Sequence, residues 1–292
     1  MIAVRQGDAT LHTLRPFLKW AGGKTQSLSH YRLLYPKKFK GYHEPFLGSG
    51  AVYFHLCQLQ MDEELPHAMT RVRLTDNNPD LINAYQVVQN FVTDLIQLLQ
   101  VHREYHSYEY YYEMRGINTS HLTDVERAAR MIYLNKTCFN GLYRVNKQGL
   151  FNVPLGRYAN PKIFDEENLL AVSAALRHTS CEIRCESFRR VIDEAKPGDF
   201  IYFDPPYYPL NATSNFTSFT VDEFNEFDHR LLADVYRQLD RRGCMVMLCN
   251  SSAPFVMNLY EGFKRLRIKA ARLINSKSDR RGKIVDLVIL NY

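Results

Sequence analysis

Short apolar segments that end in polar or glycine- and proline-rich turns are the feature that most constrains this chain. Helical periodicity follows several of them, and this alternation is typical of a protein built on an α/β sheet. We predict buried strands over residues 41–44, 72–75, 199–203 and 244–249, and a final strand over 284–291. Asn78 is a predicted helix N-cap, with Pro79 at the first helical position. Thr220 and Glu223 have capping-box spacing ahead of another amphipathic helix.

The middle of the chain has a different pattern. Over residues 80–165 the helical period dominates, and basic and aromatic side chains are frequent. Thr123 and Glu126 have the spacing of a capping box. Residues 135–158 combine short apolar pieces, glycines and cations, which is typical of an outward ribbon or hairpin. We therefore predict that residues 1–79 and 166–292 form one domain, and that residues 80–165 are inserted into it.

Composition excludes several classes of protein. Hydrophobic residues make up 46% and charged residues 23% of the chain, which is the balance of a globular protein rather than a disordered one. No apolar stretch is long enough to cross a membrane, and the N-terminus lacks the apolar core of a signal peptide. The 6 cysteines are scattered without a Cys-x-x-Cys pair, so we predict reduced thiols, a cytoplasmic protein and no metal site. A net charge of +6 permits a polyanionic partner.

The most specific motif is Asp204-Pro205-Pro206-Tyr207, directly after the predicted strand at 199–203. Each proline forces the preceding residue into an extended conformation, and open α/β sheets bind ligands where strands end. The Asp204 carboxylate and a neighbouring backbone carbonyl can then point the same way, beside the Tyr207 ring. Two acceptors and an aromatic face suit a planar base with an exocyclic amino group. A proline-rich turn with a surface acid is the alternative interpretation.

A second motif, Glu44-Pro45-Phe46-Leu47-Gly48-Ser49-Gly50, follows the first predicted strand and opens a helix. Its glycines allow a ligand to approach the backbone, and a helix N-terminus favours an anion. It is not a dinucleotide fingerprint, because Tyr53 stands at the third glycine position. Asp76 ends the next strand, where a carboxylate can accept hydrogen bonds from ribose hydroxyls. A helix-capping acid is the alternative interpretation of Asp76.

A third segment contains the only tryptophan, Trp20, and the sequence Gly23-Lys24-Thr25. These last residues match the end of a phosphate-binding P-loop, but that motif needs a glycine where Leu18 stands and a strand before it. We therefore reject an NTPase. Trp20 is a candidate aromatic wall for a cofactor, with core packing as the alternative, and Lys24 is a candidate partner for a cofactor carboxylate.

Together these segments resemble the Dam-type DNA adenine methyltransferases of the D12 class, which methylate the N6 amino group of adenine in GATC. The resemblance covers nearly the whole chain and rests on residues 17–24, 44–50, 76, 140–158, 204–207 and 209–217. It implies a Rossmann-like methyltransferase sheet that uses S-adenosylmethionine. The domain of residues 1–79 and 166–292 would be catalytic. Residues 80–165 would be a mostly helical target-recognition domain carrying a β-hairpin.

The resemblance also implies roles for individual residues. The catalytic residues would be Asp204, Pro205, Pro206 and Tyr207. The cofactor would contact Trp20, Lys24, Glu44, Pro45, Phe46, Gly48, Ser49, Gly50, Asp76 and Asp204. The residues near the target bases would be Lys19, Leu142, Arg144, Asn146, Pro154 and Tyr158, with Arg144 reading a guanine and Lys19 reaching the first guanine.

The chemistry of the motif residues agrees with this resemblance. Adenine N6 is a poor nucleophile, and hydrogen bonds to Asp204 and a proline carbonyl would stabilise the charge that develops on it. The base must leave the duplex to be reached, so we expect base flipping and a double-stranded DNA partner. No obligate protein partner is evident. Methylation of cytosine N4 in DNA or of adenine in RNA remains an alternative, as does a DNA-binding regulator with a silent methyltransferase core.

Overall fold

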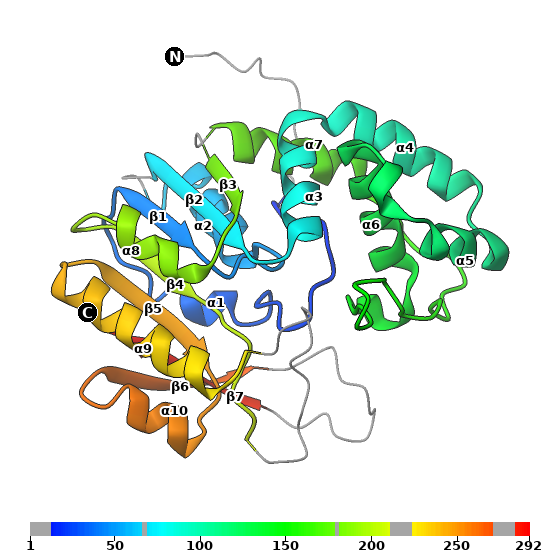
Figure 1. The fold of residues 1–292 in the computed structure, drawn as a ribbon. Coiled ribbons are helices and arrows are strands. Elements are labelled where there is room, and N and C mark those ends of the chain that lie inside the picture. The colour runs from blue at the N-terminus through cyan, green and yellow to red at the C-terminus, as the bar shows by residue number, and fades with distance from the viewer. Residues whose placement is uncertain (1–12, 66–68, 179–180, 211–223, 271–283) are drawn as a thin grey trace.

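The seven strands of the described chain form one mixed sheet. The computed structural model describes residues 13–65, 69–178, 181–210, 224–270 and 284–292. The strands are β1 (Gly41–Glu44), β2 (Arg71–Asp76), β3 (Cys181–Cys185), β4 (Phe200–Phe203), β5 (Met245–Asn250), β6 (Lys264–Ala270) and β7 (Ile284–Leu290). Their order is β3-β2-β1-β4-β5-β7-β6, in which β7 runs antiparallel to both of its neighbours and the other pairs are parallel (Figure 1). The predicted α/β fold is confirmed.

The five predicted strands correspond to β1, β2, β4, β5 and β7, each within one residue at either end. Their core positions are apolar, as in β4, where all residues are buried. The sequence analysis missed β3 and β6. Both are edge strands paired on one side only, and charged residues interrupt their apolar pattern. Such strands carry a weaker hydrophobic signal than central ones.

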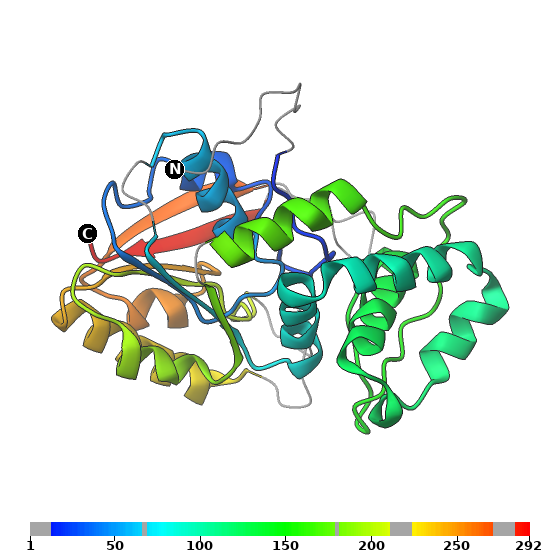
Figure 2. The ribbon, with the colours of Figure 1, turned by 90° about the horizontal axis from the view of Figure 1, so that it is seen from above.

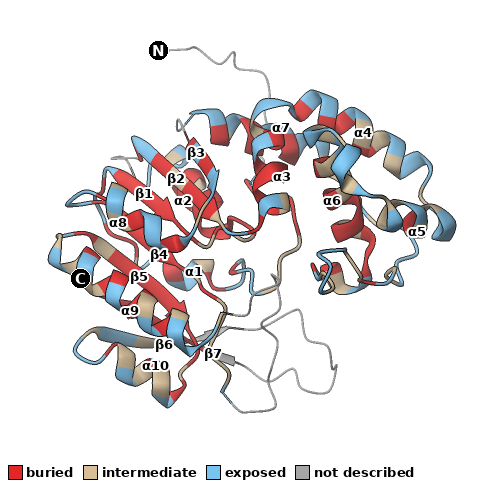
Figure 3. Cartoon of the chain, in the orientation of Figure 1, coloured by how far each residue is buried: buried red, intermediate tan, exposed pale blue. Residues whose placement is uncertain are grey.

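Helices cover both faces of the sheet. One face packs against α2 (Ala51–Met61), α3 (Pro79–Asn90) and α7 (Glu166–His178). The other packs against α8 (Val191–Glu194), α9 (Glu226–Arg241) and α10 (Pro254–Leu259). A short helix, α1 (Leu28–Tyr31), precedes β1. The buried residues form a continuous layer along the sheet and under these helices (Figure 3). No helix in the described ranges is both long and apolar enough to span a membrane.

Side chains at helix starts explain where the helices begin. Asn78 caps α3 by accepting hydrogen bonds from the backbone N–H groups of Asp80 and Leu81, at 3.1 and 3.0 Å. Thr123 and Glu126 form the predicted capping box of α6 (Asp124–Thr137). Each such cap satisfies backbone donors that the helix itself leaves unpaired. Both predicted helix starts are confirmed.

The predicted start of α9 is wrong. The predicted capping residues, Thr220 and Glu223, lie outside the described residues, and α9 begins later, at Glu226. Its N-cap is Asn225, whose side chain accepts from the N–H groups of the next residues while Asp228 bonds back to the Asn225 N–H at 3.0 Å. A capping box of the same type thus stands a few residues downstream of the predicted one.

The helices α4 (Val92–Glu104), α5 (Tyr108–Gly116) and α6 lie together beside the sheet in both ribbon views (Figures 1 and 2). The helix α3 contacts this group and the sheet alike. Its Asn83 amide donates to the Asp124 carbonyl at 2.9 Å, and its Gln86 amide donates to the Ile183 carbonyl of β3 at 2.9 Å. The predicted boundary at residue 79 therefore coincides with the start of a helix shared by both parts. The division into domains stays a prediction.

Within the predicted segment 135–158, the first three residues end α6, and residues 138–155 form a narrow ribbon rather than a regular hairpin. Two isolated antiparallel pairings, Cys138 with Leu155 and Val145 with Phe151, hold its strands together. The Asn146 side chain accepts from two backbone N–H groups of the turn that follows, those of Gln148 and Leu150, both at 3.0 Å. The turn and the pairings present Arg144 at the surface.

Candidate active site

Three carboxylates lie where adjacent parallel strands end. Glu44 is the last residue of β1, Asp76 is the last residue of β2, and Asp204 directly follows β4. Because β1 pairs with both β2 and β4, these strand ends stand side by side. The topology therefore brings three of the predicted site residues to one edge of the sheet, which is where open α/β sheets bind ligands.

The glycine turn after β1 is bonded to the end of β2. The Gly48 N–H donates to Asp76 Oδ2 at 3.1 Å, and Asp76 Oδ1 accepts from the Asn78 N–H at 3.0 Å. Gly48 has a φ of +47°, and a Cβ atom there would lie 2.9 Å from Trp20 Cδ1. Glycine is therefore needed both for the backbone conformation and for the approach of the indole ring. Asp76 shapes this turn through its backbone partners as well as facing the site.

Lys24 joins the N-terminal segment to the motif after β4. Its Nζ lies 2.6 Å from Asp204 Oδ2, donates to the Gly22 carbonyl at 2.6 Å, and stands 4.8 Å from the centre of the Tyr207 ring. The Lys24 and Asp204 side chains are only 7% and 17% exposed, so the ion pair is shielded from solvent. The predicted partner of Lys24 was a cofactor carboxylate, and in this structure the carboxylate of Asp204 holds it.

Burial shifts the pKa values of the acids upward. The pKa of Glu44 rises to about 8, mainly because the carboxyl is buried and further because Asp204 and Asp76 are nearby, although the hydroxyl of Tyr42 donates to it at 2.7 Å. Burial raises the pKa of Asp76 to about 6, against the lowering effect of backbone hydrogen bonds from Gly48 and Asn78. Acids whose pKa values are raised in this way are candidates for a functional site, and a nearby bound cation would lower these pKa values again.

Trp20 connects the glycine turn to the ribbon. Its ring stacks on Tyr143 with 5.3 Å between ring centres and 29° between planes. The Tyr143 hydroxyl donates to Asp80 of α3 at 3.0 Å. One residue earlier, the Lys19 backbone exchanges hydrogen bonds with the Asn135 amide of α6, at 2.8 and 2.7 Å. The N-terminal segment therefore links the predicted cofactor and DNA-recognition residues.

The remaining residues of the glycine motif are placed by packing. Pro45 and Ser49 are buried, and Gly50 is the left-handed N-cap of α2, with a φ of +65°. The half-buried Phe46 stacks on Phe188 with 5.3 Å between ring centres. Phe188 was not predicted, and it follows β3, one of the two strands that the sequence pattern missed.

Asn250 is a second polar residue at the site that the sequence analysis missed. It ends β5, and its side-chain oxygen accepts from the Tyr208 N–H at 3.0 Å, one residue after the Asp204–Tyr207 motif. A polar residue directly after five apolar ones, Met245 to Cys249, was the signal that could have identified it.

The predicted DNA-recognition residues are spread over the ribbon and the N-terminal segment. Arg144 is exposed, and its Nε donates to Asn152 Oδ1 at 2.7 Å. Lys19 Nζ donates to the Tyr158 hydroxyl at 3.4 Å and lies 4.5 Å from the centre of that ring. Pro154 is exposed and Leu142 is half-buried. The Asn146 oxygen is used inside the turn, as described above.

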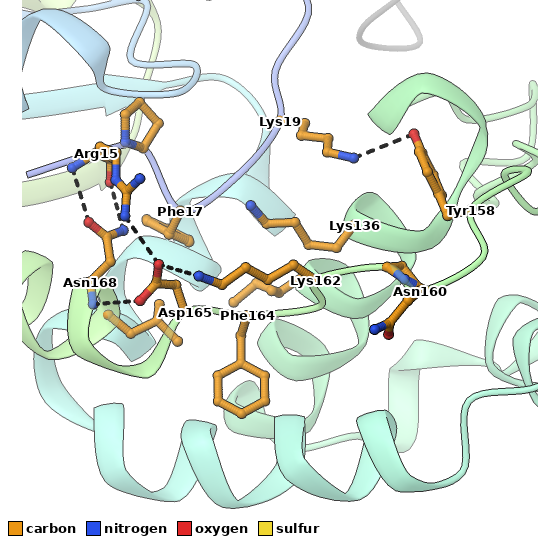
Figure 4. A pocket seen from close by; sticks show the side chains of 14 residues that line it. Arg15, Phe17, Lys19, Lys136, Tyr158, Asn160, Lys162, Phe164, Asp165 and Asn168 are labelled. Carbon is orange, nitrogen blue, oxygen red and sulfur yellow. Dashed lines mark hydrogen bonds and ion pairs between the residues drawn. The ribbon is translucent and has the colours of Figure 1, made fainter.

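A cationic cavity of about 360 Å³ lies between the N-terminal segment and the end of α6. Four basic side chains line it: Arg15, Lys19, Lys136 and Lys162 (Figure 4). Burial lowers the pKa of Lys136 to about 8, and the neighbouring cations lower it further than Asp165 raises it. Over the described parts of the chain, no group of three or more His, Cys, Asp or Glu residues is arranged to hold a metal ion.

The chain is similar to known DNA methyltransferases along nearly its whole length. It is 43% identical to the Type II methyltransferase M1.LlaDCHI of Lactococcus lactis over 96% of both chains. It is 46% identical to the Type II methyltransferase M.MjaIII of Methanocaldococcus jannaschii over 96% of this chain and 99% of that one. A DNA adenine methylase of Escherichia coli is 32% identical over 94% of this chain and 95% of its own.

A protein-family comparison gives the same result. The family described as D12 class N6 adenine-specific DNA methyltransferase matches residues 20–274, which include the carboxylates at the strand ends, Lys24 and the ribbon. This match and the relatives identify the chain as an enzyme that methylates adenine in DNA. The chain therefore belongs to the D12 class of N6 adenine-specific DNA methyltransferases.

Proposed function

We propose that this enzyme transfers a methyl group from S-adenosylmethionine to N6 of adenine in duplex GATC, after the adenine has left the helix. The observation that most directly supports this proposal is the arrangement of Lys24, Asp204 and Tyr207 at the end of β4, beside the glycine turn. The resemblance described above supports GATC as the site. The Type II names of the Lactococcus and Methanocaldococcus relatives support a role in restriction-modification.

The side chains at this edge of the sheet fit S-adenosylmethionine. When bound, this cofactor supplies a methyl group on a positively charged sulfur. Glu44, Asp76 and Asp204 bring three acidic groups to one edge of the sheet, and a bound cation would lower the raised pKa values of Glu44 and Asp76 again. Asp76 would accept hydrogen bonds from ribose hydroxyls, and Lys24 would hold the cofactor carboxylate. Trp20, fixed between Gly48 and Tyr143, would form an aromatic wall.

The Asp204–Tyr207 motif would hold the target amino group. The Asp204 carboxylate and a proline carbonyl would accept both N6 hydrogens, which stabilises the positive charge that develops on nitrogen. Tyr207 would stack on the base. Base flipping costs a few kcal/mol, and one aromatic stacking contact offsets about 1–3 kcal/mol of it. Catalysis would then depend mainly on positioning the amino group for direct displacement.

Sequence recognition would come from residues 80–165, acting as an inserted recognition domain together with Lys19. The exposed Arg144 guanidinium suits bidentate contact with guanine O6 and N7, which is worth about 1–3 kcal/mol of discrimination. The Asn152 contact would orient it. The cationic cavity beside Lys136 would receive a backbone phosphate. Such a contact would add to the affinity for DNA without contributing to the choice of sequence.

Labelled methyl transfer tests this proposal. The substrates are short duplexes with GATC, with GATC whose adenine is replaced, with a scrambled site, and RNA of matched sequence. We expect transfer to the first duplex alone, and loss of transfer in Asp204→Ala with DNA binding retained. Transfer to the adenine-free or RNA substrates would contradict the assignment. Binding without any transfer would support a silent regulator instead.

Arg144→Ala tests the recognition role separately. We expect this variant to lose discrimination between GATC and sites with a changed guanine by roughly tenfold or more, in line with the loss of a bidentate contact. An equal loss of affinity for every duplex would show that Arg144 contacts only phosphates.

A further inference from the structure

Asn250 stands beside the catalytic motif for a topological reason. The strands β4 and β5 are parallel neighbours, and Phe203 pairs with Leu248 at the end of their register. Asp204 and Asn250 follow these residues, so both strands end at the same edge of the sheet. The Asn250 side chain is buried, with only 1% of its surface exposed.

The Asn250 amide oxygen holds two backbone donors. It accepts from the Tyr208 N–H at 3.0 Å and from the Ser251 N–H at 2.8 Å. Pro205 and Pro206 have no N–H group, so few backbone donors are available to fix the Asp204–Tyr207 segment. The Tyr208 N–H is the first donor beyond that segment. Asn250 therefore restrains the backbone directly after the motif, whose two prolines offer no N–H group of their own.

Tyr208 itself is anchored on its other side. Its hydroxyl donates to Glu226 at 2.6 Å, and its ring packs 4.6 Å from that of Phe255. A residue held by α9, α10 and β5 together has little freedom to shift. The proline carbonyls proposed to accept an N6 hydrogen lie two and three residues before this anchor.

Only the oxygen of the Asn250 amide is used. The Asn250 Nδ2 group is buried and has no hydrogen-bond partner in the described part of the chain, and the facing residue of β7 is Leu287. A leucine of similar volume would remove this buried donor, but it would also leave the Tyr208 and Ser251 N–H groups without their acceptor. The amide at this position is therefore explained by the backbone that its oxygen holds.

We propose that Asn250 is a positioning residue for methyl transfer, which holds the proline carbonyls and the Tyr207 ring in place through the Tyr208 N–H. The inference rests on the proposed role of the Asp204–Tyr207 motif. Loss of the Asn250 oxygen would let the acceptors drift from the amino group. A displacement of about 1 Å can reduce the rate about 100-fold without affecting substrate affinity.

The test compares Asn250→Leu, Asn250→Asp and Ser251→Ala in steady-state assays with duplex DNA. Ser251 is the matched control, because its buried hydroxyl also lacks a partner among the residues that the structure describes, and its backbone bond to Asn250 survives the change. We expect Asn250→Leu to lower kcat at least tenfold with both KM values within threefold of wild type. We expect Ser251→Ala to stay within twofold of wild type in every parameter.

Asn250→Asp supplies a readout that a purely structural role would not change. A protonated aspartic acid keeps one acceptor oxygen and one donor, whereas its ionised form would place a second charge near Asp204. We expect kcat within threefold of wild type at pH 6 and a lower kcat at pH 9 that stays above that of the leucine variant. The ionised carboxylate still accepts from the Tyr208 N–H, but it adds a charge near Asp204. Each variant is compared with wild type at the same pH, because Glu226 and His229 also contact Tyr208.

Two outcomes would overturn the inference. One is a kcat for Asn250→Leu within threefold of wild type, and the other is an Asn250→Asp variant that is folded, as slow as the leucine variant and insensitive to pH. Fluorescence anisotropy with a labelled duplex and thermal unfolding verify that each variant binds DNA and is folded. If wild-type enzyme itself fails to methylate duplex DNA, the proposed function fails instead.

Discussion

The ion pair between Lys24 and Asp204 should couple the stability effects of the two residues. Both side chains are largely buried and their charged atoms lie 2.6 Å apart. Removing one partner of a buried pair costs about 3–5 kcal/mol, because it leaves the other charge without compensation. Asp204 keeps 17% of its side chain exposed, so we expect the lower end, about 3 kcal/mol, for Lys24→Met. The Lys24→Met/Asp204→Asn double variant removes both charges and should be clearly less destabilised than the sum of the single changes.

Equilibrium urea unfolding of the four proteins measures this coupling. We expect an interaction free energy of about 2 kcal/mol, within the range found for residues in contact. The control cycle uses Arg190 and Asp193, which are 3.0 Å apart but 61% and 58% exposed. Exposed pairs contribute about 0.2–1 kcal/mol. A Lys24–Asp204 interaction no larger than the control would refute the argument that burial makes this pair strong.

Other expectations follow from the same site and its helices. Gly48→Ala should weaken cofactor binding at least tenfold in calorimetry because its Cβ would strike the indole ring, whereas Gly149→Ala, also at positive φ but with open space around it, should leave binding unchanged. Glu44 has a pKa of about 8 in the folded enzyme against 4.5 in an unfolded chain, so its stabilising effect is complete below pH 4.5 and is lost as the pH rises to 8. The free energy of unfolding should therefore fall over this interval by at most about 1.4 kcal/mol per pH unit from this group, and Glu44→Gln should remove that contribution; an identical pH dependence in both proteins would contradict it. Asn78→Ala should lower the unfolding free energy by about 1 kcal/mol through loss of the α3 cap, while Asn90→Ala at the exposed end of that helix should cost less, as urea unfolding can establish.

Much of the local structure could be predicted from the sequence. The central strands, the caps at Asn78 and Thr123 and the motif at Asp204 all depend on residues close together in the chain. Such features are recorded in the local pattern of apolar and polar residues. The edge strands β3 and β6 were missed, because strands paired on one side tolerate charged residues and lose the continuous apolar signal.

The sequence by itself determined which chemical groups this enzyme has and the order in which strands and helices carry them. It did not determine that Lys24 would pair with Asp204, that Trp20 would stand between Gly48 and Tyr143, or that Asn250 would restrain Tyr208. Those contacts exist because the strand order β3-β2-β1-β4-β5-β7-β6 places the ends of strands that are distant in sequence next to one another. Only burial of the two sheet faces under their helices selects that order, and no local pattern of residues contains it.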